Sequence, residues 1–241
     1  MAPVKHLATL LLVMSLPTAV WAQISPIRPG FSSGSEVVAP GEVELGISYE
    51  FQENASSLNR IPVTSVRAGV TKGMEVFVDW NGLQKCRHRG KSQYELPALG
   101  AKSQLVTQPA YGLSLIAAVA AENDGGLIRM NPFAGLNVDA AFTSAVSVFA
   151  ALQLSAATAP AGTDWEWNAM AGVSWELTER VSLTGEWYNG YQLYTGEDYF
   201  VNQASAAFAI LPGMALESYV GWSPNKNIPL FGGMGASISL F

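Results

Sequence analysis

The stretch Glu42-Val43-Glu44-Leu45-Gly46-Ile47-Ser48-Tyr49-Glu50-Phe51-Gln52 alternates polar and apolar residues without a break. Because successive side chains of a β-strand point to opposite faces, it predicts a strand with one apolar and one polar face. Its length matches the roughly 9 to 11 residues with which a tilted strand crosses the hydrocarbon layer of a membrane. A soluble sheet tolerates shorter strands.

The stretch from Trp165 to Leu177 repeats this alternation, with tryptophans near both ends. In a strand tilted by about 40°, Trp165 and Trp175 would lie about 25 Å apart along the membrane normal, which is the spacing of two interfacial aromatic girdles. Tryptophans in the core of a β-sandwich are the alternative. The predicted girdle residues are Trp80, Trp165, Trp167, Trp175, Trp187 and Trp222.

Short turns and long polar loops alternate along the chain. Turn residues gather at 71–74, 106–109, 137–139, 177–180 and 211–214, and polar stretches at 53–60, 82–97, 121–128, 156–164, 189–198 and 223–229. This alternation is typical of outer-membrane barrels, whose turns face the periplasm and whose loops face outward. A propeller, which also repeats, lacks it.

The predicted fold is therefore all-β: a transmembrane antiparallel up-and-down β-barrel of about twelve strands in residues 42–241. The alternation is weak in 99–106 and 130–136, so ten strands with a long folded loop is the alternative.

The two ends of the chain carry export signals. Residues 1–22 combine Lys5, an apolar run and a small-residue cleavage site, which predicts a cleaved signal peptide and location in a Gram-negative-type outer membrane. Residues 23–41, rich in Pro, Gly and Ser, predict a periplasmic segment that either plugs the lumen or forms a disordered tail.

The terminal Phe241 resembles the signal read by the barrel assembly machinery, an expected partner. The apolar residues Met234, Ala236, Ile238 and Leu240 alternate out of phase with Phe241. Either a β-bulge shifts the phase or recognition is loose.

The charge and cysteine content exclude several classes. The formal net charge of −6 argues against nucleic-acid binding, and the single cysteine, Cys86, excludes an intramolecular disulfide. No cofactor is expected, and no metal-ligand cluster stands out. The basic residues of 85–91 predict an outer loop that either binds lipopolysaccharide phosphates, beside the general contact with outer-membrane lipid, or is merely solvated.

The opening of the mature chain carries a resemblance. Ile27-Arg28-Pro29-Gly30-Phe31-Ser32, followed by a Pro40-Gly41 turn, resembles the start of the outer-membrane transporter family named for the meta-pathway of phenol degradation. That family shows an Arg-Pro-x-Phe segment, here Arg28, Pro29 and Phe31, preceded by Asp, where this chain has Ile27. The resemblance covers roughly residues 27–52 and implies transport without naming a cargo.

If the apolar face meets lipid, the polar face lines an acid-rich lumen. Carboxylates there predict a narrow passage that favours cations, whereas charges paired across a filled interior are the alternative. The predicted lumen residues are Glu44, Glu50, Arg67, Glu75, Asp79, Lys102, Arg129, Glu166, Glu176, Glu186 and Glu217.

The pattern thus predicts a channel or transporter for passive uptake of a small solute. The bulky inward residues Phe77, Phe133, Tyr188, Tyr219 and Phe231 suit an apolar or aromatic solute as well as plain packing. The alternatives are a closed structural or adhesion barrel and a lipid-modifying hydrolase on the outer membrane. A Ser-His hydrolase would have to use His88, the one histidine left after signal cleavage, and no Gly-x-Ser-x-Gly motif occurs, so no enzyme is predicted.

Overall fold

The computed structural model describes residues 34–53, 58–86, 92–124, 127–159, 162–193, 196, 198–224 and 230–240. Strands occupy most of them. They are β1 (Val43–Glu53), β2 (Leu58–Thr71), β3 (Met74–Trp80), β4 (Leu83–Cys86), β5 (Ser92–Tyr94), β6 (Ala98–Gln108), β7 (Tyr111–Asp124), β8 (Leu127–Ala141), β9 (Val146–Ala159), β10 (Gly162–Thr178), β11 (Val181–Gln192), β12 (Asp198–Leu211), β13 (Met214–Trp222) and β14 (Leu230–Leu240). Among the described residues there is no helix long and apolar enough to cross a bilayer.

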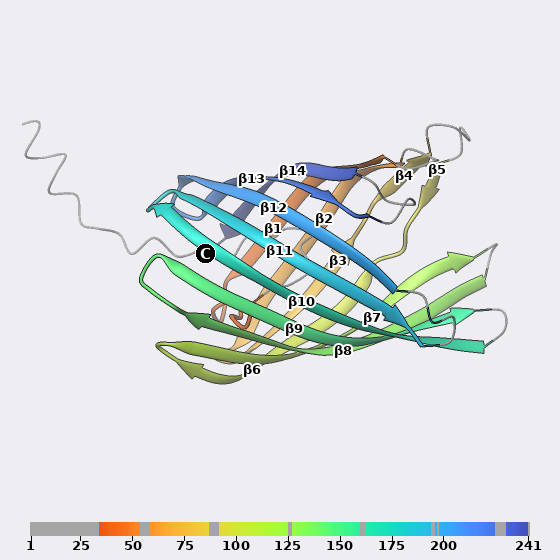
Figure 1. Ribbon diagram of the computed structural model, residues 1–241, viewed down its shortest axis with the longest axis horizontal. Coiled ribbons are helices and arrows are strands. Elements are labelled where there is room, and N and C mark those ends of the chain that lie inside the picture. The colour runs from red at the N-terminus through yellow and green to blue at the C-terminus, as the bar shows by residue number, and fades with distance from the viewer. Residues whose placement is uncertain are drawn as a thin grey trace, which may run out of the picture.

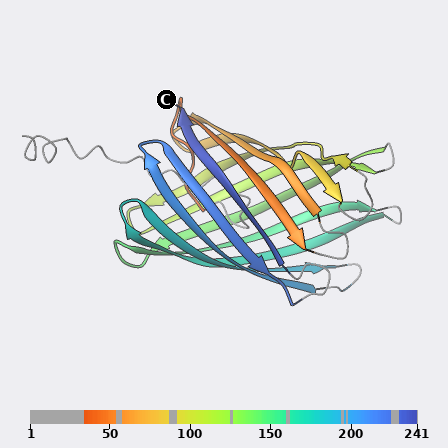
Figure 2. The ribbon, with the colours of Figure 1, turned by 90° about the horizontal axis from the view of Figure 1, so that it is seen from above.

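The strands close into one antiparallel barrel, elongated along its axis (Figures 1 and 2). Strand β1 pairs with β2 on one side and with β14 on the other, which closes the sheet. Strand β4 continues β3 along the start of β2, and β5 pairs with β4 just before β6 begins. The wall therefore has the twelve strands that the sequence predicts, and the ten-strand alternative is wrong.

Four of the five predicted turns link the ends of neighbouring strands, but 137–139 is not a turn. Strand β8 continues through it to Ala141, and the connection to β9 follows at 142–145. Asn137 is fully buried and its amide donates to Ser114 Oγ at 3.3 Å. Asn137 and Asp139 are thus inward polar residues of a strand, with Val138 facing outward between them.

Five of the six predicted loops are partly strand. Strand β2 begins at Leu58 within 53–60, and β11 runs to Gln192 within 189–198. Strands β4 and β5 lie within 82–97, β7 and β8 extend into 121–128, and β9 and β10 extend into 156–164. The ladder there continues in register, with Ala159 opposite Gly162. Backbone pairing needs no apolar side chains, so these strands continue beyond the apolar pattern from which the prediction was made.

The two faces of the wall differ as the alternation predicts. Large apolar side chains lie outward and exposed, among them Ile47, Val173 and Met234, at 52%, 49% and 66% exposure. Inward polar residues such as Glu75 and Lys102 are buried at 1% and 0%. An apolar exterior around a polar interior fits a barrel that is surrounded by lipid.

Strand β14 keeps one phase through its described residues. Its register with β1 runs unbroken from Leu230 opposite Glu53 to Leu240 opposite Val43, so no β-bulge interrupts the pairing of residues 230–240. Met234 and Ile238 face outward, whereas Ser237 is buried on the inner face. Phe241 lies outside the described residues.

Candidate functional site: the barrel lumen

A buried ion cluster occupies the inner wall of β1, β2, β3 and β6, near the turn between β2 and β3. Arg67 on β2 lies between two carboxylates, with Nη1 3.0 Å from Glu44 Oε2 and Nη2 2.7 Å from Glu75 Oε2. Lys102 Nζ lies 3.7 Å from the other oxygen of Glu75. The four predicted lumen residues therefore meet as two acids and two bases, and this part of the wall follows the alternative of paired charges.

The described part of the segment before β1 lies on this cluster. The Val38 amide donates to Glu75 Oε2 at 2.8 Å, and Lys102 Nζ donates to the Gly34 carbonyl at 3.5 Å. Two strands further along the wall from β6, the Ser35 amide donates to Asp139 Oδ1 of β8 at 2.6 Å. Residues 34–38 thus contact the inner wall at β3, β6 and β8.

The segment passes close to the β2 backbone just before it becomes strand. Pro40 forms a parallel bridge with Gly69, and the Gly41 amide donates to the Gly69 carbonyl at 3.0 Å. A Cβ on Gly69 would lie 2.0 Å from the Ala39 carbonyl oxygen. Only glycine permits this approach, and Gly41, with φ of 84°, turns the chain into β1.

Beside the segment lies a hollow of about 440 Å³ at the turn end of the lumen. Residues 34–36 form one side, and β6 to β11 with their turns form the rest. Its acidic groups are Glu36, Asp139 and Glu176, and Phe149 supplies an aromatic ring. Its hydroxyl groups come from Ser35, Thr107, Tyr111, Thr143, Ser144, Ser147, Ser174 and Thr184.

Glu36 is the one acid of this hollow that belongs to the segment rather than to a strand. Its side chain reaches solvent in the hollow, but the surrounding wall limits its hydration. This partial burial, together with the nearby carboxylate of Asp139, raises the pKa of Glu36, while Lys102 and Arg67 oppose the rise. A cation in the hollow would relieve this repulsion.

The rest of the lumen wall carries further ionic and hydrogen-bonded groups. Arg60 pairs with Glu50 and lies 3.7 Å from Glu95, and Tyr219 donates to the second oxygen of Glu50 at 2.8 Å. The last strands carry Glu217, which accepts from Ser237 Oγ at 2.9 Å.

Around Glu166, Tyr199 donates to Oε1 at 2.6 Å, and the hydroxyls of Tyr188 and Tyr199 lie 2.8 Å apart. The Tyr188 hydroxyl also bonds Asn168.

Inward aromatic rings lie against glycines of neighbouring strands. A Cβ on Gly172 would lie 2.2 Å from the Phe149 ring, and one on Gly221 would lie 2.0 Å from the Phe231 ring. Gly190 beneath Tyr199 and Gly100 beneath Phe77 repeat the arrangement. The rings therefore pack against the wall at positions where a side chain larger than glycine would collide with them.

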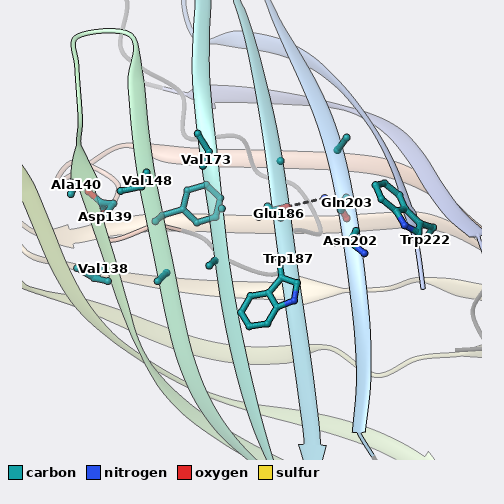
Figure 3. Close-up of a pocket in the computed structure, with 16 residues that line it drawn as sticks. Val138, Asp139, Ala140, Val148, Val173, Glu186, Trp187, Asn202, Gln203 and Trp222 are labelled. Atoms are coloured by element: carbon teal, nitrogen blue, oxygen red, sulfur yellow. Dashed lines mark hydrogen bonds between the residues drawn. The ribbon is translucent and has the colours of Figure 1, made fainter. Parts of the chain in front are cut away.

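A row of paired inward residues connects two of these rings across six strands. Each strand from β9 to β14 contributes one residue, and each residue pairs with the next: Phe149, Gly172, Glu186, Gln203, Gly221 and Phe231. Gln203 Nε2 donates to Glu186 Oε2 at 2.9 Å (Figure 3). The Oε1 atom of Gln203 is buried and accepts no hydrogen bond from the described residues.

The outer surface of this wall is also hollowed. A depression of about 780 Å³ lies over β8 to β13, with Ala150, Ala171 and Ala204 among the residues that line it. Trp187 and Trp222 stand beside Asn202 on adjacent strands (Figure 3). Of the six predicted girdle tryptophans, Trp165, Trp167, Trp175, Trp187 and Trp222 are exposed. Trp80 is half-buried and donates from Nε1 to the Glu95 carbonyl at 2.7 Å.

The other predicted lumen residues are distributed along the wall. Asp79 accepts from Ser65, its inward neighbour on β2, and Arg129 stands opposite Glu122 in the β7–β8 ladder. Arg28, Pro29, Phe31 and His88 lie outside the described residues. Metal-ligand groups of three or more Asp, Glu, His or Cys are absent from the described part of the chain.

Sequence reasoning missed Asp139, Glu36 and Ser35 as lumen groups. Asp139 was assigned to a turn, and the other two precede the first strand, where no alternation exists to assign a face.

Comparisons with known proteins identify the fold. No protein-family model and no curated protein match the sequence. An outer-membrane channel from Pseudomonas putida F1 aligns over 89% of this chain and 100% of its own, with a TM-score of 0.66 and 10% identity. The NanC porin is also similar: the alignment covers 81% of this chain and 100% of that porin, with a TM-score of 0.60 and 8% identity. For the KdgM porin the alignment covers 81% of this chain and 99% of that porin, with a TM-score of 0.58 and 10% identity. The chain therefore has the fold of outer-membrane channel barrels.

Proposed function

We propose that this protein is an outer-membrane channel for passive uptake of a small solute, with apolar or aromatic solutes as the candidate class. The observation that carries the proposal is the hollow of about 440 Å³ inside a closed barrel whose lumen wall is polar and whose exterior is apolar. A barrel filled by packed side chains would not leave such a space. The fold shared with porins supports the same role.

The lumen charge supports a preference for cations. On the β1–β6 side, acids and bases pair, as Arg67 does with Glu44 and Glu75. Strands β9 to β14 contain no Lys or Arg, yet their inner faces carry Glu166, Glu176, Glu186 and Glu217. Carboxylates along one wall raise the local concentration of cations and repel anions.

This preference is testable in planar bilayers under a salt gradient. Replacing Glu166, Glu176 and Glu186 with Gln should lower the K⁺ to Cl⁻ permeability ratio at least about twofold, since three wall charges disappear. The matched control replaces Glu53, Glu179 and Asp198, at strand ends or in a turn, with their amides. An unchanged reversal potential in the first variant would reject the selectivity role.

We further propose that residues 23–41 restrict the channel from the periplasmic side. The hydrogen bonds of Gly34, Ser35 and Val38 to three different strands support this role. Deleting residues 23–39, with Pro40 and Gly41 kept, should increase the single-channel conductance severalfold. Equal conductance in the two proteins would contradict it. Absence of current from both, with folding confirmed by a heat-dependent gel shift, would favour the closed structural barrel.

We also propose that this chain is related to the outer-membrane transporter family named for the meta-pathway of phenol degradation. The proposal rests on the Arg28-Pro29-Gly30-Phe31 opening and the Pro40-Gly41 turn. Faster uptake of labelled phenol by liposomes that contain the barrel than by empty liposomes would support this relation. Equal rates would remove the reason for assigning an aromatic cargo.

A further inference from the structure

We propose that the turn-end hollow binds organic monocations, namely amines that carry an aromatic or aliphatic body. This inference rests on the proposed channel function and names the solute class that the channel would take. The hollow is the site, and its side chains supply both a charge partner and an apolar surface.

The charge of the hollow is one-sided. Three carboxylates, Glu36, Asp139 and Glu176, line it from the segment, β8 and β10, and no Lys or Arg is among the lining residues. Lys102 and Arg67 act on Glu36 from the neighbouring cluster, but both are engaged with Glu75. A cationic solute would therefore meet net negative charge in this space.

The polar lining is suited to an ammonium group. Hydroxyls of Ser147, Ser174 and Thr184 line the same hollow and offer further acceptors. Ser35, at 1% exposure, lines the same hollow, and its Oγ has no hydrogen-bond partner among the described residues. A donor-rich ligand would satisfy an oxygen that the protein itself leaves without a partner.

An aromatic ring supplies the apolar surface. Phe149 lines the hollow, and its ring packs against Gly172 of the neighbouring strand. The face of an aromatic ring attracts a cation and also packs against an aromatic or aliphatic body. The absence of a metal-ligand group in the described chain favours an organic cation over a coordinated metal ion.

The same ring begins the row that continues along the wall. From Phe149 the row passes Gly172 to the Glu186 and Gln203 pair and ends at the Phe231 ring. Gln203 adds a second buried acceptor without a partner among the described residues. An amine that leaves the hollow thus meets the same combination of acceptor and ring again.

The test is calorimetric titration of the detergent-folded mature barrel with benzylammonium. Benzyl alcohol and benzoate are matched ligands of neutral and opposite charge. Benzylammonium should bind at least about tenfold more tightly than benzyl alcohol, and benzoate should bind most weakly. Equal affinity for benzylammonium and benzyl alcohol would overturn the proposal.

Variants assign the binding to this hollow. Glu176→Gln, at an exposed position, should weaken benzylammonium binding about three- to tenfold, and Phe149→Leu about threefold. Glu179→Gln, in the adjacent turn and outside the hollow, is the matched control and should leave the affinity unchanged. Equal losses in Glu176→Gln and Glu179→Gln would reject the site.

A bilayer recording separates this inference from the channel function. Binding that depends on Glu176 in a barrel without ion current would keep the site and reject the channel. Cation-favouring current without benzylammonium binding would keep the channel and reject the site.

Discussion

At the scale of single residues, the central contact of the lumen is Arg67 between Glu44 and Glu75. Arg67→Met would leave two buried carboxylates close together, so we expect the free energy of unfolding to fall by about 3–5 kcal/mol. Urea unfolding of the barrel in detergent measures this loss, and Arg180→Met in a turn, which should cost under about 0.5 kcal/mol, is its control. Similar midpoints for the two variants would show that the cluster is not a stability element. The alternation predicted that these charges face inward, but their pairing depends on the lateral register of three strands, which a period of two does not specify.

At the scale of elements, alternation and turn residues predicted the twelve strands, whereas strand ends escaped prediction because ladders continue past the apolar pattern, as at Ala159 and Gly162. For the segment before β1, the sequence left open whether it plugs the lumen or forms a disordered tail, since its hydrogen bonds join it to side chains far away in the sequence. Its docking should depend on pH through Glu36, whose pKa is raised from 4.5 in the docked state. The docked segment therefore holds the proton of Glu36 more tightly than the undocked segment does. The contribution of Glu36 to docking is full below about pH 4.5 and is lost as the pH rises through the raised pKa of Glu36. A nitroxide label attached at Ala39→Cys, in a Cys86→Ser background, should become more mobile as the pH rises through the raised pKa of Glu36. Glu36→Gln should abolish the change, and an identical pH profile in that variant would exclude Glu36 as its cause.

At the scale of the whole molecule, the barrel has no free edge only because β14 pairs with both β13 and β1. The last strand of the chain must therefore close the sheet, which makes its end the expected contact of the assembly machinery. The strand's lipid-facing residues, Met234 and Ile238, are out of phase with Phe241, and its pairing ends at Leu240. Phe241 itself lies outside the described residues, and we expect its role to lie in recognition by the assembly machinery rather than in stability. We expect Phe241→Ala to lower the amount of assembled barrel in cells severalfold, while the free energy of unfolding of the refolded protein, measured in urea, changes by under about 0.5 kcal/mol. Ser239→Ala, on the same face two residues earlier, is the control and should assemble normally. Full assembly of Phe241→Ala would show that the machinery reads the strand without its terminal ring, and a shifted midpoint would place the ring in the fold itself.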